Sequence, residues 1–248
     1  MTKKEIQEVR AIEVSHKKVA IVGFAPSWNQ APFEDESFEI WGLNELYKLF
    51  EKHPHGRAER WFEIHNPNSP SKAIPEHIDW LSKCPIPLYM QKVEERFPMA
   101  QELPLKEMIE HFGSGYLTNS ISYMIAFAIY EGFREIHVYG VDMAQDSEYQ
   151  TQRPSCEYWL GRAEGMGIKT YIPPTSDLLK CAGLYGYETD NQMRVKMKAR
   201  IKELKDRQKG YQQEINKLNG NIVQLNGAVQ QIGGAIDDCN FWLKNWSY

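Results

Sequence analysis

A heptad repeat of apolar residues in the C-terminal part constrains this chain more than any other feature of its sequence. Between Met197 and Trp246, apolar side chains recur with alternating spacings of three and four residues, and only Gln208 and Cys239 interrupt them, in register. A repeat held for about seven heptads predicts an α-helical coiled coil. At ~1.5 Å rise per residue, a continuous helix over residues 197–246 would be roughly 75 Å long.

The side chains on the seam of this repeat indicate how many helices associate. Mostly β-branched residues at a and mostly leucine at d favour a parallel two-stranded coil, and Ile232 with the aromatic residues leaves a trimer open. We therefore expect the chain to associate with itself through residues 197–246, as a parallel dimer or trimer. The a positions are Ile201, Gln208, Ile215, Ile222, Val229, Ile236 and Leu243, and the d positions include Leu204, Tyr211, Leu218, Leu225 and Ile232.

Five glycines between residues 210 and 234 leave two alternatives open, a helical hairpin and a helix packed on the rest of the chain. Each glycine costs ~1 kcal/mol of helix stability relative to alanine. All five lie outside the a and d positions, however, and the heptad phase runs through them without a break. A hairpin loop usually resets that phase, so a continuous helix is the expectation.

The preceding part of the chain, residues 18–188, alternates short apolar runs with helical patterns. Several runs are apolar on both faces, as in parallel strands that are covered on both sides. The almost wholly apolar segment Ser120–Tyr130 predicts a buried helix. The expected strands are Val19–Val22, Phe38–Leu43, Glu59–Ile64, Ile86–Met90, Glu135–Tyr139 and Lys169–Ile172.

Together these patterns predict an α/β fold: a Rossmann-like, mostly parallel sheet sandwiched by helices, followed by a long C-terminal α-helical coiled coil. The predicted organisation is an N-terminal extension over residues 1–17, a Rossmann-like nucleotide-binding domain over 18–188, and a coiled-coil oligomerisation segment over 190–248.

Charge and composition exclude several classes of protein. A formal net charge of −4 lacks the basic excess of a protein bound to duplex DNA or to an anionic membrane, and the basic stretch Arg194–Lys209 is typical of a solvated helix face. The four cysteines form no CxxC pair, which argues against a zinc site and a disulfide framework. Neither a signal peptide nor an apolar run of ~20 residues is present. We expect a soluble cytoplasmic protein (host cytoplasm if viral). It should bind no metal, and neither a membrane nor nucleic acid should be its partner.

Small or polar residues follow nearly every expected strand. The turn over residues 23–27 has little side-chain bulk, but it lacks both GxGxxG and the lysine of a P-loop, so neither a dinucleotide nor a Walker-type site is indicated. The carboxyl ends of parallel strands form the ligand crevice of such sheets. The predicted nucleotide-binding residues are Gly23, Ala25, Ser27, Asn44, Asn66, Ser120 and Asp142. The alternative is that these residue types simply favour loops and helix caps.

The order of these motifs resembles the bacterial sialyltransferases of glycosyltransferase family 42. The matching segments are VGFAPS, WGLNELY, FEIHNPNS and TNSISYMIAFAIYEGFREIHVYGVDM, within roughly residues 18–180. The chain also resembles related Rossmann-like domains of unknown function and the pterin pyrophosphokinase-like domains. Its segments QRPSCEYW and SDLLK resemble uncharacterised phage-type proteins. For all the predicted nucleotide-binding residues except Asp142, the family resemblance implies contacts with a cytidine nucleotide.

The chain departs from this family at the first turn and in the segment after Asp142. Ala25 stands where the family usually has glycine, and Phe24 where the sialyltransferases have asparagine. The family's general base is a histidine in a flexible lid, and this chain has no histidine between Asp142 and Ile168.

Other residues of that segment are the candidates for catalysis. Glu157 is a candidate base, because an apolar neighbour can raise a carboxyl pKa toward neutrality, and Arg153 and Tyr158 would steady a departing phosphate. The alternative is that Arg153 and Glu157 form an (i, i+4) ion pair on a helix surface. His65 follows the third strand and either faces the crevice or is a half-buried structural histidine.

Three functions compete. The chain could be a nucleotide-sugar transferase, a nucleotide-binding or sequestering protein without turnover, or an assembly protein that uses the fold as a scaffold. We expect a glycosyltransferase-like protein that binds a nucleotide or nucleotide sugar and forms oligomers through the coiled coil, and we leave its catalysis open. No cofactor is expected besides that small ligand.

Overall fold

The computed structural model describes residues 18–69, 73–143, 148–181, 185–186 and 192–246. The chain divides into two compact units, Met1–Lys196 and Met197–Tyr248, and each is described by itself. The predicted N-terminal extension, residues 1–17, lies outside the described residues, as do residues 144–147 of the segment after Asp142.

The first unit is built on a seven-stranded sheet in the order β5-β4-β3-β2-β1-β6-β7. All six strand pairs are parallel. The strands are β1 Lys18–Val22, β2 Phe38–Leu43, β3 Arg60–Glu63, β4 Leu88–Met90, β5 Ala100–Glu102, β6 Glu135–Tyr139 and β7 Lys169–Tyr171. The α/β fold and its predicted parallel sheet are therefore confirmed. The sequence missed only β5, a short edge strand without an apolar run.

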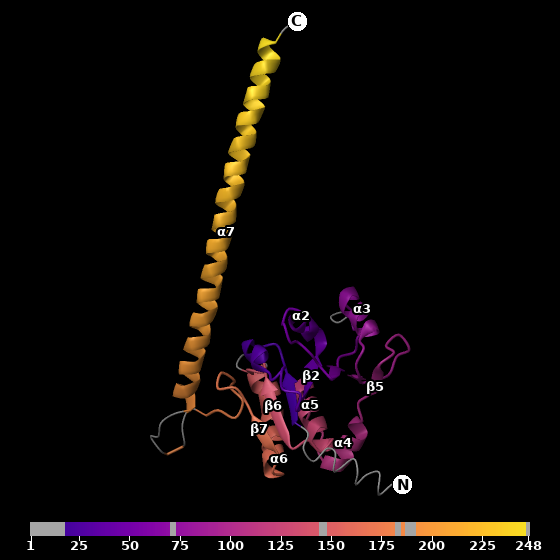
Figure 1. The fold of residues 1–248 in the computed structure, drawn as a ribbon. Coiled ribbons are helices and arrows are strands. Elements are labelled where there is room, and N and C mark those ends of the chain that lie inside the picture. Colours follow the sequence, from indigo (N-terminus) through magenta and orange to yellow (C-terminus); the bar gives the residue numbers. More distant parts are fainter. Residues whose placement is uncertain (1–17, 70–72, 144–147, 182–184, 187–191, 247–248) are drawn as a thin grey trace. The chain divides into compact units, whose positions relative to one another are not determined.

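Helices lie on both sides of this sheet (Figure 1). They are η1 Pro26–Gln30, η2 Asn44–Leu46, α2 Tyr47–Phe50, α3 Pro75–Lys83, α4 Leu105–Phe112, α5 Ser120–Tyr130, η3 Glu148–Gln152 and α6 Arg153–Gly165. The apolar helix α5 packs against β1 and β3, with α4 and α6 as its neighbours. Its predicted bounds are confirmed, and eight of its residues are buried.

Aromatic side chains fill the space between the sheet and its helices. On one face, the Trp41 ring of β2 lies 5.1 Å from the ring of Phe62 and 5.7 Å from that of Phe127 on α5. On the other face, the Trp61 ring of β3 lies 4.7 Å from that of Trp80 on α3. Burial of such large rings contributes on the order of 2–3 kcal/mol per side chain, so the two aromatic layers hold the helices to the strands.

The ends of β1 and β6 approach each other more closely than any side chain would allow. The amide of Gly23 donates to Tyr139 O at 2.8 Å, and the amide of Ala25 donates to Gly140 O at 2.8 Å. A Cβ at Gly23 would lie 2.5 Å from Gly140 O, and a Cβ at Gly140 would lie 2.2 Å from Gly23 O. Gly140 also has φ +65°, which favours glycine. Two glycines are therefore needed for the strands to continue their pairing into the turn.

The second unit, as far as Asn245, is part of one uninterrupted helix. Helix α7, Gln192–Asn245, runs for 54 residues through all five glycines, so the hairpin alternative is wrong. Its seam side chains are exposed, for example 53% at Ile222 and 66% at Leu225. No helix among the described residues has the length and apolar character needed to cross a membrane.

The close approach of β1 and β6 predicts opposite effects for two glycine-to-alanine changes. Gly23→Ala forces a methyl group against Gly140 O, and we expect a loss of about 1–3 kcal/mol in the free energy of unfolding. In a unit of this size each kcal/mol lowers the Tm by roughly 2–4 °C. Thermal unfolding followed by circular dichroism measures the change.

Gly161→Ala is the matched control, because a Cβ at this position of α6 would meet nothing within 4 Å. Alanine favours the helix by up to ~1 kcal/mol, so this variant should unfold at the wild-type Tm or above it. Equal melting temperatures for Gly23→Ala and the wild type would contradict the proposed steric role of Gly23.

Candidate functional site

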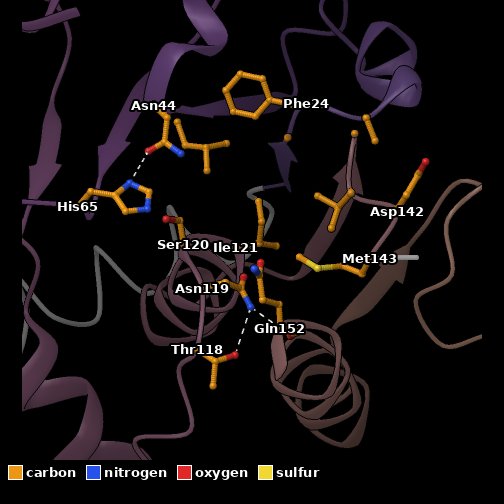
Figure 2. A pocket seen from close by; sticks show the side chains of 15 residues that line it. Phe24, Asn44, His65, Thr118, Asn119, Ser120, Ile121, Asp142, Met143 and Gln152 are labelled. Carbon is orange, nitrogen blue, oxygen red and sulfur yellow. Dashed lines mark hydrogen bonds between the residues drawn. The ribbon is translucent and has the colours of Figure 1, made fainter. Parts of the chain in front are cut away.

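A cavity of about 370 Å³ opens at the carboxyl ends of β1, β2 and β6. The chain order reverses between β1 and β6, and this switch point is where open α/β sheets bind ligands. Figure 2 shows the lining side chains. They belong to Gly23, Phe24, Ala25, Leu43, Asn44, His65, Thr118, Asn119, Ser120, Ile121, Gly140, Val141, Asp142, Met143 and Gln152.

Most of the predicted nucleotide-binding residues come together around this cavity. Five of them line it, namely Gly23, Ala25, Asn44, Ser120 and Asp142, although they come from four different loops. Ser27 and Asn66 are not part of the lining.

Ser27 and Asn66 make local contacts instead. Ser27 is buried, and its Oγ accepts a hydrogen bond from the amide of Gly140 at 2.9 Å, so Ser27 supports the floor of the cavity from below. Asn66 is exposed, and its Oδ1 accepts from the amide of Asn68 at 2.9 Å. That contact closes a turn of the backbone, as asparagine often does in loops.

The first turn of α5 presents backbone donors to the cavity. Asn119 caps the helix: its Oδ1 accepts from the amide of Ser122 at 3.0 Å, and Ser122 Oγ accepts from the amide of Asn119. Within the described residues, the amides of Ser120 and Ile121 have no acceptor, and both residues line the cavity. Free amides at a helix N-terminus, where the helix dipole is positive, attract anions.

Two lining residues adopt a backbone conformation that is costly for residues other than glycine. Asn44 has φ 49° and Met143 has φ 53°. The indole of Trp61 donates to Asn44 O at 3.0 Å and holds this backbone in place. Strained residues of this kind cost about 1–3 kcal/mol each and cluster at functional sites, so their position supports assigning the cavity as the functional site.

A buried carboxylate lies behind the cavity wall, and sequence reasoning missed it. Glu63, the last residue of β3, has a side chain only 1% exposed. Its Oε1 lies 3.1 Å from Nδ1 of His65, and its Oε2 lies 2.8 Å from Nε2 of the buried His77 on α3. Burial raises the pKa of the Glu63 carboxyl, but the hydrogen bonds from the two histidines more than offset this, so the pKa lies below its ordinary value.

His65 is the histidine whose orientation the sequence left open, and it lines the cavity. Its Nδ1 also lies 3.2 Å from Oδ1 of Asn44 (Figure 2). The motif HNPNS contained the signal, because His65 follows the strand end as directly as Asn66 does. Phe24, 48% exposed, and Gln152 are further lining residues that the prediction did not include.

The three predicted catalytic residues do not belong to the lining. Arg153 Nε lies 2.7 Å from Glu157 Oε1, which is the helix ion pair weighed as the alternative. Glu157 Oε1 also accepts from the amide of Leu179 at 2.8 Å, and the hydroxyl of Tyr158 accepts from Arg162 at 3.2 Å. The contact between Glu157 and Leu179 fastens the chain after β7 to α6, and the other two contacts lie within α6. The catalytic roles of the three residues stay predictions.

No group of three or more histidine, cysteine, aspartate or glutamate side chains is placed to hold a metal ion within the described ranges. The described lining of the cavity also includes no lysine or arginine. The donors that this lining offers an anion are therefore backbone amides and uncharged side chains.

No protein-family model matches the sequence, and no curated protein matches it. The chain is similar to solved structures of sialyltransferases from Campylobacter jejuni. The CstII enzyme in complex with cytidine-5'-monophosphate is 20% identical, with 65% of this chain and 82% of that chain covered and a TM-score of 0.44. CstII in complex with the substrate analogue CMP-3FNeuAc is 19% identical, with 63% and 79% covered and a TM-score of 0.42. The alpha-2,3-sialyltransferase in apo form is 17% identical, with 63% and 75% covered and a TM-score of 0.40. At these identities and TM-scores, the function of this chain has to be argued from its own cavity.

Proposed function

We propose that the first unit binds a nucleotide or a nucleotide sugar in the cavity at the carboxyl ends of β1, β2 and β6. One observation carries this proposal. Gly23 and Gly140 form a cavity floor without side chains, and the same cavity is lined by Ser120 and Ile121, whose amides have no acceptor among the described residues. A small-residue floor lets a phosphate approach the backbone, and the helix amides supply donors to it.

The distribution of charge around the cavity orients the ligand. The carboxylate of Asp142 repels a phosphate, whereas the start of α5 attracts one, and Figure 2 shows Ser120 and Asp142 on different sides of the cavity. The phosphate therefore lies at Ser120, and a ribose hydroxyl donates to Asp142. The half-exposed ring of Phe24 offers an apolar face on which a base stacks. The motif resemblance to glycosyltransferase family 42 makes a cytidine nucleotide the first candidate.

We also propose that α7 joins two or three copies of this chain in a parallel coiled coil. Its a and d side chains are roughly half to four-fifths exposed over the whole helix, for example 49% at Ile215 and 80% at Leu243. A long single helix is stabilised mainly by packing of its apolar face, so this seam calls for a partner with the same repeat. A second copy in parallel register supplies it, with every a residue facing its own equivalent.

The phosphate position predicts that Ser120→Asp weakens nucleotide binding without harming the fold. An added carboxylate at the first turn of α5 repels the phosphate, yet it interacts favourably with the helix dipole, so the Tm should stay equal or rise. Isothermal titration of the full chain with CMP, UMP and CMP-activated sugars measures the affinity. We expect a loss of about 10-fold or more, since hydrogen bonds to charged groups contribute about 1.5–3 kcal/mol.

Ser37→Asp adds the same charge in an exposed loop before β2, at the amino end of that strand and so away from the cavity at the carboxyl ends, and should leave the affinity unchanged. The proposal fails if none of these nucleotides binds the wild-type protein. It also fails if Ser120→Asp binds them as tightly as the wild type does.

The parallel register predicts a disulfide between two copies at Cys239, a d position of α7. Cys181 and Cys239 are exposed, and Cys84 and Cys156 are buried, so the variant Cys181→Ser leaves Cys239 as the one exposed thiol. In a parallel coil the two Cys239 residues face each other at a distance that a disulfide spans. Mild oxidation should give a linked dimer on a non-reducing gel, and dithiothreitol should reverse it.

Moving the thiol by one residue supplies the control. In the background of Cys181→Ser and Cys239→Ser, the change Asp238→Cys places a cysteine at an outer c position and should give little linked dimer. An antiparallel pair or a monomer would leave Cys239 unlinked, and either result would contradict the parallel coil.

A further inference from the structure

Glu63 requires hydrogen-bond donors from both histidines that it contacts. Its side chain is almost fully buried, and its pKa is below the ordinary value because His65 and His77 donate to it. A buried carboxylate without donors would cost several kcal/mol. The hydrogens of the two short contacts therefore lie on Nδ1 of His65 and on Nε2 of His77.

The surroundings of His77 provide a hydrogen-bond acceptor for only one of its two ring nitrogens. Its side chain is 1% exposed, and its Nδ1 has no hydrogen-bond partner within the described part of the chain. A protonated His77 would bury an N–H group at Nδ1 without an acceptor. The hydrogen of His77 that has an acceptor is therefore the one on Nε2, toward Glu63.

His65 is held with Nδ1 toward the protein and with Nε2 available to a ligand. Its Nδ1 contacts two oxygens, Oε1 of Glu63 at 3.1 Å and Oδ1 of Asn44 at 3.2 Å, and both contacts are satisfied when Nδ1 carries the hydrogen. The lone pair of the neutral ring then lies on Nε2. The side chain is 42% exposed at the cavity, and Nε2 has no hydrogen-bond partner among the described residues.

A carboxylate that fixes one imidazole nitrogen while the other faces a ligand is the arrangement of a general base. A purely structural Glu–His pair would bury both groups, as Glu63 and His77 are buried here. Both histidines contact the same carboxylate, but His77 is buried and His65 lines the cavity. His77 therefore has a positioning role, and His65 is the one available for chemistry.

We propose that His65 is the catalytic base of this site and that Glu63 is its positioning residue; this rests on the proposed binding of a nucleotide sugar. The oxygen of a hydroxyl group, from water or an acceptor alcohol, forms a bond to the anomeric carbon as its proton passes to Nε2 of His65. The bond from that carbon to the phosphate oxygen breaks, and its electron pair leaves with the nucleotide. The imidazolium is stabilised by Glu63 and then returns its proton to solvent.

The experiment measures nucleotide release and nucleotide binding on the same full-length proteins. Release from a panel of CMP- and UDP-activated sugars, with and without alcohol acceptors, is followed by chromatography, and CMP affinity by titration. His65→Asn keeps a donor where Nδ1 stood and removes Nε2. We expect release to fall about 100-fold or more, with CMP affinity changed less than about threefold.

Two further variants separate a chemical from a structural role. In His65→Ala, added imidazole should restore part of the release, which it would not do for a residue that only supports the fold. Glu63→Gln removes the charge and presents an amide N–H₂ to one histidine, so kcat should fall about 10-fold or more with KM within about twofold. His55→Asn, in an exposed loop away from this cavity, should behave as the wild type does.

The outcomes decide between the two proposals. A wild-type protein that binds CMP and releases no nucleotide from any donor would overturn the role of His65 and leave nucleotide binding standing. Undiminished release by His65→Asn would overturn the role of His65 as well. A wild-type protein that binds none of the nucleotides would refute the proposed function itself, and the catalytic assignment with it.

Discussion

The close approach of the β1 and β6 backbones is the constraint on which the rest of this fold depends. These two strands lie on either side of the point where the chain order reverses, and Gly23 and Gly140 let their hydrogen bonding continue beyond the strand ends. Ser27 is buried beneath them. Its side chain does not line the cavity, and its Oγ accepts a hydrogen bond from the amide of Gly140. Packing in the core and the shape of the cavity floor are thus determined by the same few backbone atoms. A ligand phosphate would lie on a surface that has little freedom to move.

Glu63 imposes a second constraint, because its charge is retained inside an aromatic layer. Replacing a buried ion pair by apolar residues is often neutral or stabilising, so stability alone gives no reason to keep this carboxylate. What it achieves is orientation: it fixes one buried histidine on α3 and one histidine at the cavity from a single position on β3. A carboxylate that is costly to bury thus also defines the direction of the His65 ring.

Sequence patterns were enough for the sheet and for the helix of the second unit, because both depend on apolar periodicity. They missed β5, whose three residues Ala100–Glu102 lie at an edge and need no apolar face. Gly23, Asn44 and Ser120 line one cavity, as the patterns led us to expect, since these residues follow strands or begin a helix. The separation of Asn66 from the cavity lining has a local cause. Asn66 bonds within its own loop while its neighbour His65 lines the cavity, and residue type and spacing do not tell which of two adjacent polar side chains enters the crevice.

Asn44 connects these constraints. Its strained backbone is held by the indole of Trp61, a core residue of β3, and its side-chain oxygen contacts His65 at the cavity. A left-handed conformation persists only where the surroundings over-determine it, and here they do so from the core side. Because one residue receives a hydrogen bond from the core and gives a fixed oxygen to the imidazole, the ring is positioned before any ligand arrives. Preorganisation of this kind reduces the reorganisation that catalysis would otherwise require, and it makes the aromatic layer around Trp61 part of the site rather than only its support.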